Sequence, residues 1–213
     1  MTKTFLFDFD GTLVDSMPTY ASLMLRILDE RNIGYGEDTV KIITPLGYGG
    51  TAKYFREVLG VTDSEDELVA RMNEYALFEY TYNIPAKDGV IDTLHKMKER
   101  GYRLNVLTAS PHLVLDPCLK RLGIYDIFDN VWSCDDFPCT KADPKIYELA
   151  AKRMDVPVEN VIFVDDNIGA VTASMKAGAR GVGIYDRSSE DYREQFIQSA
   201  DGYVFGFSEL LDI

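Results

Sequence analysis

Short runs of apolar residues recur along the chain, and segments with helical patterning separate them. The runs are residues 5–7, 104–107, 161–164 and 181–184. Runs that are apolar at nearly every position are typical of parallel strands covered on both faces. Val90, Leu94 and Met97 illustrate the helical spacing between them. Glycines stand where such helices should end, at Gly101, Gly123 and Gly178. The alternation predicts an α/β fold, a Rossmann-like parallel sheet with right-handed crossovers.

One long segment breaks this alternation and contains helical patterns alone. An apolar stripe runs through Tyr20, Leu23, Met24, Ile27 and Leu28. Further helices are expected near 37–44 and 51–59, and residues 62–65 resemble the cap of a fourth that runs toward residue 82. We therefore expect a helical-bundle module over 17–83, inserted into a core made of 1–16 and 84–213. Residues 186–213 should add a helix, a short strand near 203–205 and a closing helix.

Composition and charge narrow the classes of partner. Lysine and arginine total 22 against 35 acidic residues, a net charge of −13 over 213 residues. Such an acidic chain repels phosphate backbones and anionic lipid, so we expect neither nucleic-acid nor membrane partners. No apolar run approaches the roughly 18–20 residues that cross a bilayer, and three cysteines are too few for a disulfide framework. We expect a cytoplasmic protein, monomeric or homodimeric.

Candidate chemistry follows the strands. In parallel sheets, ligands bind beyond the carboxyl ends of the strands. The first run ends in Asp8 and Asp10, a later one in Thr108, and another in Asp165 and Asp166. Carboxylates from two strand ends can converge on one hard cation, and Mg²⁺ prefers oxygen ligands. The sequence therefore predicts a magnesium site at this edge of the sheet.

The same residue types suit phosphoryl transfer. One carboxylate of the Asp8–Asp10 pair can act as a nucleophile, because aspartate forms aspartyl-phosphate intermediates, and its neighbour can act as general acid and base. A phosphoryl group brings further negative charge, so a second cation is expected. Lys141 is the candidate, since it comes shortly before a predicted helix whose N-terminus also favours anions.

These residues together carry a resemblance to a known family. Residues 8–16, DFDGTLVDS, are similar to the first motif of the haloacid dehalogenase superfamily. Thr108 resembles its second motif, Lys141 with Pro144 its third, and 165–166 its fourth. The four motifs occur in order along the chain, and the first is highly specific.

The resemblance implies a role for each catalytic group. Asp8 would be the nucleophile and a Mg²⁺ ligand. Asp10 would be the general acid and base, and its backbone carbonyl would also bind Mg²⁺. Thr108 would hold the transferring phosphoryl group, and Lys141 would neutralise Asp8 and that group.

The remaining motif residues are implied to bind substrate or metal. The backbone N–H groups of Ala109 and Ser110 would join Thr108 on the phosphoryl oxygens. Asp166 would ligate Mg²⁺, and Asp165 would do so directly or through water. The helical insertion is placed like the small helical cap of the family, which closes over the site and selects the substrate.

Within that insertion, residues 45–51 are similar to the substrate-specificity loop of phosphoglycolate-phosphatase-like members. Gly47 would allow close approach of a ligand. Tyr48, Thr51 and Lys53 would then meet the leaving group, and Lys53 would suit an anionic one.

The expected function is Mg²⁺-dependent hydrolysis of a small phosphorylated metabolite through an aspartyl-phosphate. The acid at Asp10 disfavours the dehalogenase branch, whose carbon–halogen bond needs no leaving-group proton. A β-phosphoglucomutase-like mutase is the main alternative, although its cap histidine and arginine align with Tyr20 and Gly50 here. A non-catalytic phospholigand-binding regulator is the other alternative. Phosphoglycolate, sugar phosphates and nucleoside monophosphates all remain open as substrates.

Overall fold

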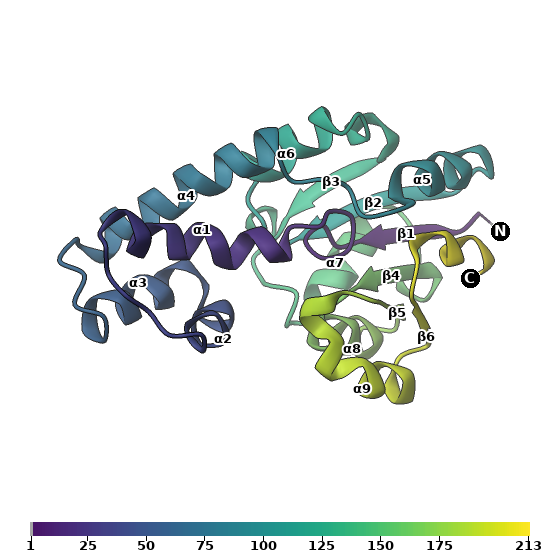
Figure 1. Ribbon diagram of the computed structural model, residues 1–213. Helices are drawn as coiled ribbons and strands as arrows, with labels where there is room; N and C mark the ends of the chain where they lie inside the picture. The colour runs from purple at the N-terminus through teal and green to yellow at the C-terminus, as the bar shows by residue number, and fades with distance from the viewer. Residues whose placement is uncertain (1) are drawn as a thin grey trace. The chain divides into compact units, whose positions relative to one another are not determined.

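The protein contains a six-stranded parallel sheet flanked by helices, seen in a computed structural model that describes residues 2–213 (Figure 1). The chain divides into two compact units, a core unit of residues 1–15 and 85–213 and a helical unit of residues 16–84. The strands are β1 (Thr4–Phe7), β2 (Arg103–Thr108), β3 (Asn130–Ser133), β4 (Val161–Asp165), β5 (Arg180–Ile184) and β6 (Gly202–Val204). Their order in the sheet is β3-β2-β1-β4-β5-β6, with every neighbouring pair parallel. The predicted α/β fold is confirmed.

Helices cover the core sheet because its strands are buried on both faces. The helices are α5 (Val90–Glu99), α6 (His112–Arg121), α7 (Lys145–Arg153), α8 (Ile168–Lys176) and α9 (Arg193–Ser199). On one face, Leu6 and Phe163 pack with residues of α7 and α8 in one apolar cluster. On the other face, the rings of Phe5 and Phe7 stack with their centres 5.5 Å apart, and the ring centres of Phe7 and Phe207 are 5.4 Å apart. Burial of these large side chains supplies the main stabilisation of the sheet.

The central strands lie where the apolar runs place them, but β3 is absent from the prediction. Its sequence, Asn130–Ser133, is half-buried and polar in part, as an edge strand can be. The strand expected near 203–205 is β6, and the closing helix is the 3-10 helix η6 (Phe207–Asp212). The three glycines expected at helix ends all have positive φ, with Gly101 at 77° after α5.

The helical unit is built around the apolar face of its first helix. Its elements are α1 (Met17–Glu30), α2 (Thr39–Ile43), η1 (Thr44–Leu46), α3 (Gly47–Glu57) and α4 (Glu65–Tyr82). Leu23, Met24 and Ile27 of α1 are buried, as their helical spacing predicts. Between helices, Arg31 forms a two-pronged ion pair with Asp63, at 2.8 and 2.5 Å.

The prediction for residues 47–50 is wrong. They form the first turn of α3, although the sequence predicts a loop there and a helix only from residue 51. Thr51, Ala52 and Phe55 are buried and fix the helix. The glycines lie in the first turn, where backbone N–H groups have no helical partner in any case. Packing therefore outweighs their poor helix propensity.

Across residues 2–213, none of the helices is both long and apolar enough to cross a membrane.

A capping box begins α4 and gives a direct test of the helical unit. Ser64 accepts from the Glu67 N–H at 3.2 Å, and Glu67 accepts from the Ser64 N–H at 2.8 Å. We expect Ser64→Ala to lower the free energy of unfolding by about 1 kcal/mol, because one helix N–H loses its acceptor. Urea denaturation followed by circular dichroism measures this. Ser64→Asp, which keeps a capping oxygen, is the control, and an equal loss in both variants would contradict the assignment.

A histidine bridge ties the start of α6 to the 3-10 helix η3 (Cys134–Asp136). His112 contacts Asp116 through Nδ1 and Asp136 through Nε2, each at 2.8 Å. The hydrogen bond with Asp116 raises the pKa of His112 above its ordinary value of 6.5; partial burial opposes the rise and Asp136 adds to it. A raised folded-state pKa means that the stabilisation is complete below the unfolded pKa and fades as the pH rises through the folded one.

We therefore expect His112→Gln to cost more stability below pH 6.5 than at alkaline pH. Urea unfolding of both proteins at several pH values gives the difference. His95 is exposed on α5, so His95→Gln is the matched control. An equal cost at every pH would show that the charge of the imidazole does not contribute.

Candidate active site

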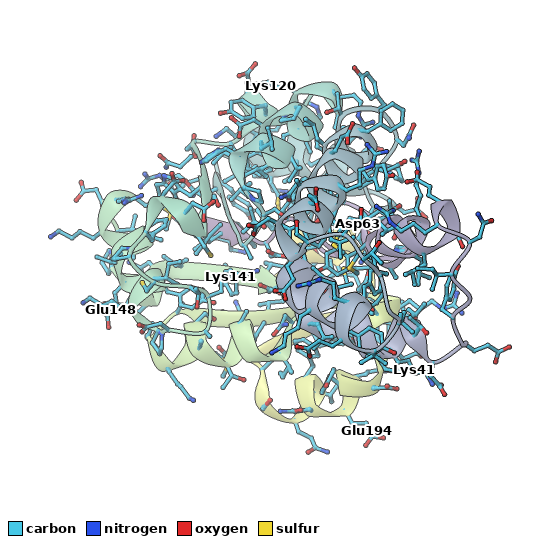
Figure 2. All side chains as sticks on the ribbon, turned by 90° about the vertical axis from the view of Figure 1, so that its left-hand side faces the viewer. Lys41, Asp63, Lys120, Lys141, Glu148 and Glu194 are labelled. Atoms are coloured by element: carbon cyan, nitrogen blue, oxygen red, sulfur yellow. The ribbon has the colours of Figure 1, made fainter. Side chains whose placement is uncertain are left out.

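The carboxyl ends of β1 and β4 bring three aspartates together with one lysine. Oxygens of Asp8, Asp165 and Asp166 all lie within 4.8 Å of one another, and all three residues are buried. Lys141, from the loop before α7, forms ion pairs with Asp8 and Asp165. Figure 2 looks at the core unit from this end of the sheet, and Lys141 is labelled there.

Asp8 is held by the sheet itself. Its N–H donates to the Val164 carbonyl at 2.9 Å, which extends the β1–β4 ladder by one residue beyond Phe7. The side chain is 3% exposed. The ladder therefore fixes the backbone of Asp8 beside the end of β4.

The turn after Asp8 requires a glycine. Gly11 has φ of 74°, and a Cβ there would lie 2.6 Å from a carboxylate oxygen of Asp166. Only a residue without a side chain can take this conformation and leave room for that carboxylate. Thr12 adds a long contact from its hydroxyl to Asp166, at 3.4 Å. The turn thus packs directly against the end of β4.

Lys141 is fixed at both ends of its chain. Its ammonium donates to Asp8 Oδ1 and, at 2.8 Å, to Asp165 Oδ2. Its backbone carbonyl lies 2.9 Å from the hydroxyl of Tyr147, which also lies 3.0 Å from the Ala170 carbonyl. Tyr147, on α7, thereby links the lysine loop to the start of α8.

Asp165, the last residue of β4, and Asp166, which follows it, do not cap α8. Asn167 caps α8, accepting from the N–H groups of Gly169 at 2.8 Å and Ala170 at 3.2 Å. Asp165 Oδ1 accepts from the Asn167 N–H at 2.7 Å, while its other oxygen meets Lys141. Both aspartate side chains therefore face the cluster.

Too little positive charge is present for these carboxylates. Burial, then the neighbouring Asp165, hold the pKa of Asp8 well above its ordinary value, and Lys141 only partly offsets them. The same two causes raise the pKa of Asp166 to about 8. Burial lowers the pKa of Lys141, but Asp165 and Asp8 outweigh it and raise the pKa well above normal. One ammonium thus faces three buried carboxylates.

This donor set fits a divalent cation. The ligand atoms are carboxylate oxygens, which Mg²⁺ prefers, and they converge from two strand ends. A cation with two positive charges would offset the two causes that raise the pKa of Asp8 and Asp166, which are burial and then the neighbouring Asp165. Within residues 2–213 this is the one group of three or more such side chains with converging ligand atoms.

The second strand end contributes hydroxyl groups beside Asp10. Thr108 is buried at the end of β2, and its hydroxyl oxygen accepts from the Ser110 N–H at 3.0 Å. Ser110 in turn donates from its hydroxyl to Asp10 Oδ2 at 2.5 Å. Ala109 between them is exposed. The backbone N–H of Ser110 therefore already donates within the loop. A phosphoryl oxygen, the predicted partner of this N–H, would have to compete with the Thr108 hydroxyl.

The residues predicted from the helical unit differ in what they offer. Tyr48 stacks on Tyr20 with ring centres 5.6 Å apart. Lys53 is exposed and lies 3.9 Å from Glu57. Thr51 is fully buried, and its hydroxyl donates to the Ile43 carbonyl at 3.3 Å, so its side chain serves packing and the predicted leaving-group contact has no support here. Gly47 begins α3 with φ of 64°.

Sequence reasoning missed two side chains around the cluster. Tyr147 does not follow a predicted strand, so its sequence position indicates only a core residue. It lies six positions after Lys141, which is close enough for a contact between the loop and the helix. Lys87 lies outside every motif, and its ammonium donates to the Gly11 carbonyl at 2.6 Å. No local pattern marks it, because its partners are far away in the sequence.

Curated relatives of the chain are phosphatases by name. Pyrophosphatase PpaX of Bacillus velezensis is 29% identical, over 84% of this chain and 81% of its own. Phosphoglycolate phosphatase of Haemophilus influenzae is 30% identical, over 97% and 96%. The phosphorylated carbohydrates phosphatase of Thermotoga maritima is 27% identical, over 81% and 80%.

Solved structures share the fold along nearly the whole chain. A predicted phosphoglycolate phosphatase from Haemophilus somnus superposes with a TM-score of 0.84 at 21% identity, covering 99% of this chain and 97% of that one. CbbY from Rhodobacter sphaeroides, in complex with phosphate, gives 0.80 at 23% identity, covering 99% and 96%.

The family described as haloacid dehalogenase-like hydrolase matches residues 2–178. That span includes all four motifs and the three-aspartate cluster. The chain is therefore a hydrolase that belongs to the haloacid dehalogenase-like family.

Proposed function

We propose that the protein is a Mg²⁺-dependent phosphatase that hydrolyses a small phosphate monoester through an aspartyl-phosphate on Asp8. The observation that carries the proposal is the cluster at the strand ends, where Asp8 lies buried with Asp165, Asp166 and Lys141. Phosphatase names among the curated relatives point to the same reaction class.

Asp8, Asp166 and Asp165 would hold the metal, together with the Asp10 carbonyl that the family resemblance implies. Bound there, Mg²⁺ supplies positive charge to the phosphoryl oxygens and keeps the carboxylates ionised. A carboxylate must be ionised to act as a nucleophile, and the raised pKa of Asp8 without metal argues that a cation is needed for this.

In the first step, a carboxylate oxygen of Asp8 attacks phosphorus. The P–O bond to the leaving alcohol breaks, and Asp10 gives its proton to the departing oxygen. Lys141 stays hydrogen-bonded beside Asp8 and balances charge on the phosphoryl oxygens. The Thr108 hydroxyl, with its oxygen oriented by the Ser110 N–H, can donate to one of those oxygens.

In the second step, Asp10 takes a proton from water as the water oxygen attacks phosphorus. The bond from phosphorus to the Asp8 oxygen breaks and inorganic phosphate leaves. Asp10 regains the proton that it gave up in the first step, so the cycle closes without a further acid or base.

The helical unit would act as a cap that selects the leaving group. It is inserted between the first motif and the rest of the core unit, with linkers at residues 15–16 and 84–85. Tyr48 with its stacked partner Tyr20, and the exposed Lys53, are the residues that we propose for contact with the leaving group.

The proposal predicts which replacement abolishes turnover. With Mg²⁺ present, we expect phosphate release from at least one ester in a panel of phosphoglycolate, sugar phosphates and nucleoside monophosphates, assayed beside the anhydride pyrophosphate. Asp8→Asn should lower the rate by at least about 10⁴-fold, because the amide cannot form the acyl phosphate. Colorimetric phosphate release measures this, with chelator as the metal-free control.

Two outcomes of this assay would contradict the proposal. Release that survives in Asp8→Asn would remove Asp8 as the nucleophile. Interconversion of sugar phosphates without net phosphate release would favour a mutase. Matched circular dichroism spectra of variant and wild type exclude a folding defect.

Mg²⁺ binding is testable without any substrate. At ten times its dissociation constant, Mg²⁺ should stabilise the wild type by about 1.4 kcal/mol, which raises the melting temperature by about 3–6 °C. Without metal, Asp166→Asn should melt no lower than the wild type, because one of three crowded carboxylates is neutralised. It should gain less from Mg²⁺. Equal gains at matched ionic strength would place the metal elsewhere.

A further inference from the structure

Lys87 uses its ammonium to join three separate points of the core unit. Nζ donates to the Gly11 carbonyl at 2.6 Å, to the Tyr185 carbonyl at 2.7 Å and to Asp186 Oδ2 at 3.0 Å. Three partners match the three N–H donors of an ammonium. The side chain is 19% exposed, so most of its length is buried. The contact is therefore a mostly buried hydrogen-bond network and not an exposed surface ion pair.

The partners of Lys87 lie at the ends of the two strands that flank β4. Gly11 is in the turn between the strand end of Asp8 and the rest of the first motif, packed against the Asp166 carboxylate. Tyr185 and Asp186 directly follow β5, the strand that pairs with β4. We call Lys87 and its three acceptors, on Gly11, Tyr185 and Asp186, the Lys87 clamp. Because β4 lies between β1 and β5 in the sheet, this clamp spans the end of β4, where Asp165 and Asp166 lie.

Asp186, the carboxylate of the Lys87 clamp, is itself held by hydrogen bonds. Asp186 is 5% exposed. Its other oxygen, Oδ1, accepts from the Ser188 N–H at 2.9 Å and from the Ser188 hydroxyl at 2.6 Å. Ser188 therefore holds the Asp186 carboxylate in place as an acceptor for the Lys87 ammonium.

The backbone around Lys87 is anchored to the same turn. Its N–H donates to the Leu13 carbonyl at 3.0 Å, and a bridge pairs Val14 with Ala86. The Asp15 N–H donates to the Pro85 carbonyl at 3.0 Å. The segment where the chain re-enters the core unit thus runs beside the first-motif turn, and the Lys87 side chain crosses from one to the other.

We infer that Lys87 is a positioning residue of the active site, an inference that rests on the proposed function. By holding the Gly11 carbonyl, it presses the turn against Asp166 and sets the place of Asp10, one residue before Gly11. Without the ammonium, two backbone carbonyls and one buried carboxylate lose their donor, which favours rearrangement of the turn. Polar groups just outside a metal's ligands commonly tune affinity and rate in this way.

The test compares Lys87→Met, Lys87→Arg and Asp186→Asn with Lys98→Met. Lys98 forms an ion pair with Asp129 at 2.6 Å, on α5 of the same unit, and is the matched control. We expect Lys87→Met to lower kcat about ten- to hundredfold and to weaken Mg²⁺ binding, measured by calorimetry on the substrate-free protein, by about tenfold. KM for the ester should stay within about twofold.

The other variants separate positioning from simple stability. Lys87→Arg keeps the charge and several donors, so it should recover part of kcat and of Mg²⁺ affinity. Asp186→Asn should fall between the wild type and Lys87→Met. Lys98→Met should match the wild type in both measurements. If Lys87→Met unfolds, a loss of kcat and of Mg²⁺ affinity in folded Asp186→Asn, with neither lost in Lys98→Met, still supports the inference.

The inference is overturned if Lys87→Met, folded by circular dichroism, keeps wild-type kcat and Mg²⁺ affinity. It is also overturned if Lys98→Met loses as much as Lys87→Met. A wild type that releases no phosphate would defeat the proposed function instead; calorimetric Mg²⁺ binding would then still decide the role of Lys87.

Discussion

The shared ammonium of Lys141 is the interaction on which the rest of the site depends. It contacts Asp8 and Asp165, and these two carboxylates with Asp166 form a buried group of like charges. Burying charge without a partner costs several kcal/mol per ion. One lysine offsets only part of that cost, so the folded site keeps an excess of negative charge. A divalent cation bound beside the three carboxylates would offset this imbalance.

The fold makes this unfavourable grouping unavoidable. Phe7 pairs with Val164 in the β1–β4 ladder, and the next residues of both strands are Asp8 and Asp165. Strand register therefore brings the two carboxylates side by side, and the large aromatic core beneath them resists any slip. Residues outside the sheet then complete the arrangement, with Tyr147 holding the lysine loop from α7. The stability of the sheet therefore offsets the repulsion among the carboxylates at the carboxyl ends of its strands.

What the sequence could predict depended on how local each signal was. Apolar runs marked the central strands, and the aspartates that follow them could be placed at one edge, because parallel strands end together. Short-range periodicity could not mark β3, which is half-exposed, nor the first turn of α3, where burial of Phe55 overrides three glycines. Lys87 left no trace at all. Its partners lie 76 to 99 positions away, so only the folded chain reveals it.

In the proposed mechanism, the two aspartates of the first motif would supply two different chemistries from one short segment. Asp8 is 3% exposed and surrounded by carboxylates and a lysine, whereas Asp10 is partly exposed and accepts a hydrogen bond from Ser110. A nucleophile benefits from exclusion of water, because water would compete for phosphorus and screen the attracting charges. A general acid and base must exchange its proton with a leaving group and then with water, so it needs access to both. Asp8 and Asp10 are two residues apart, so the difference in exposure arises at the point where the chain leaves the sheet and enters the turn at Gly11.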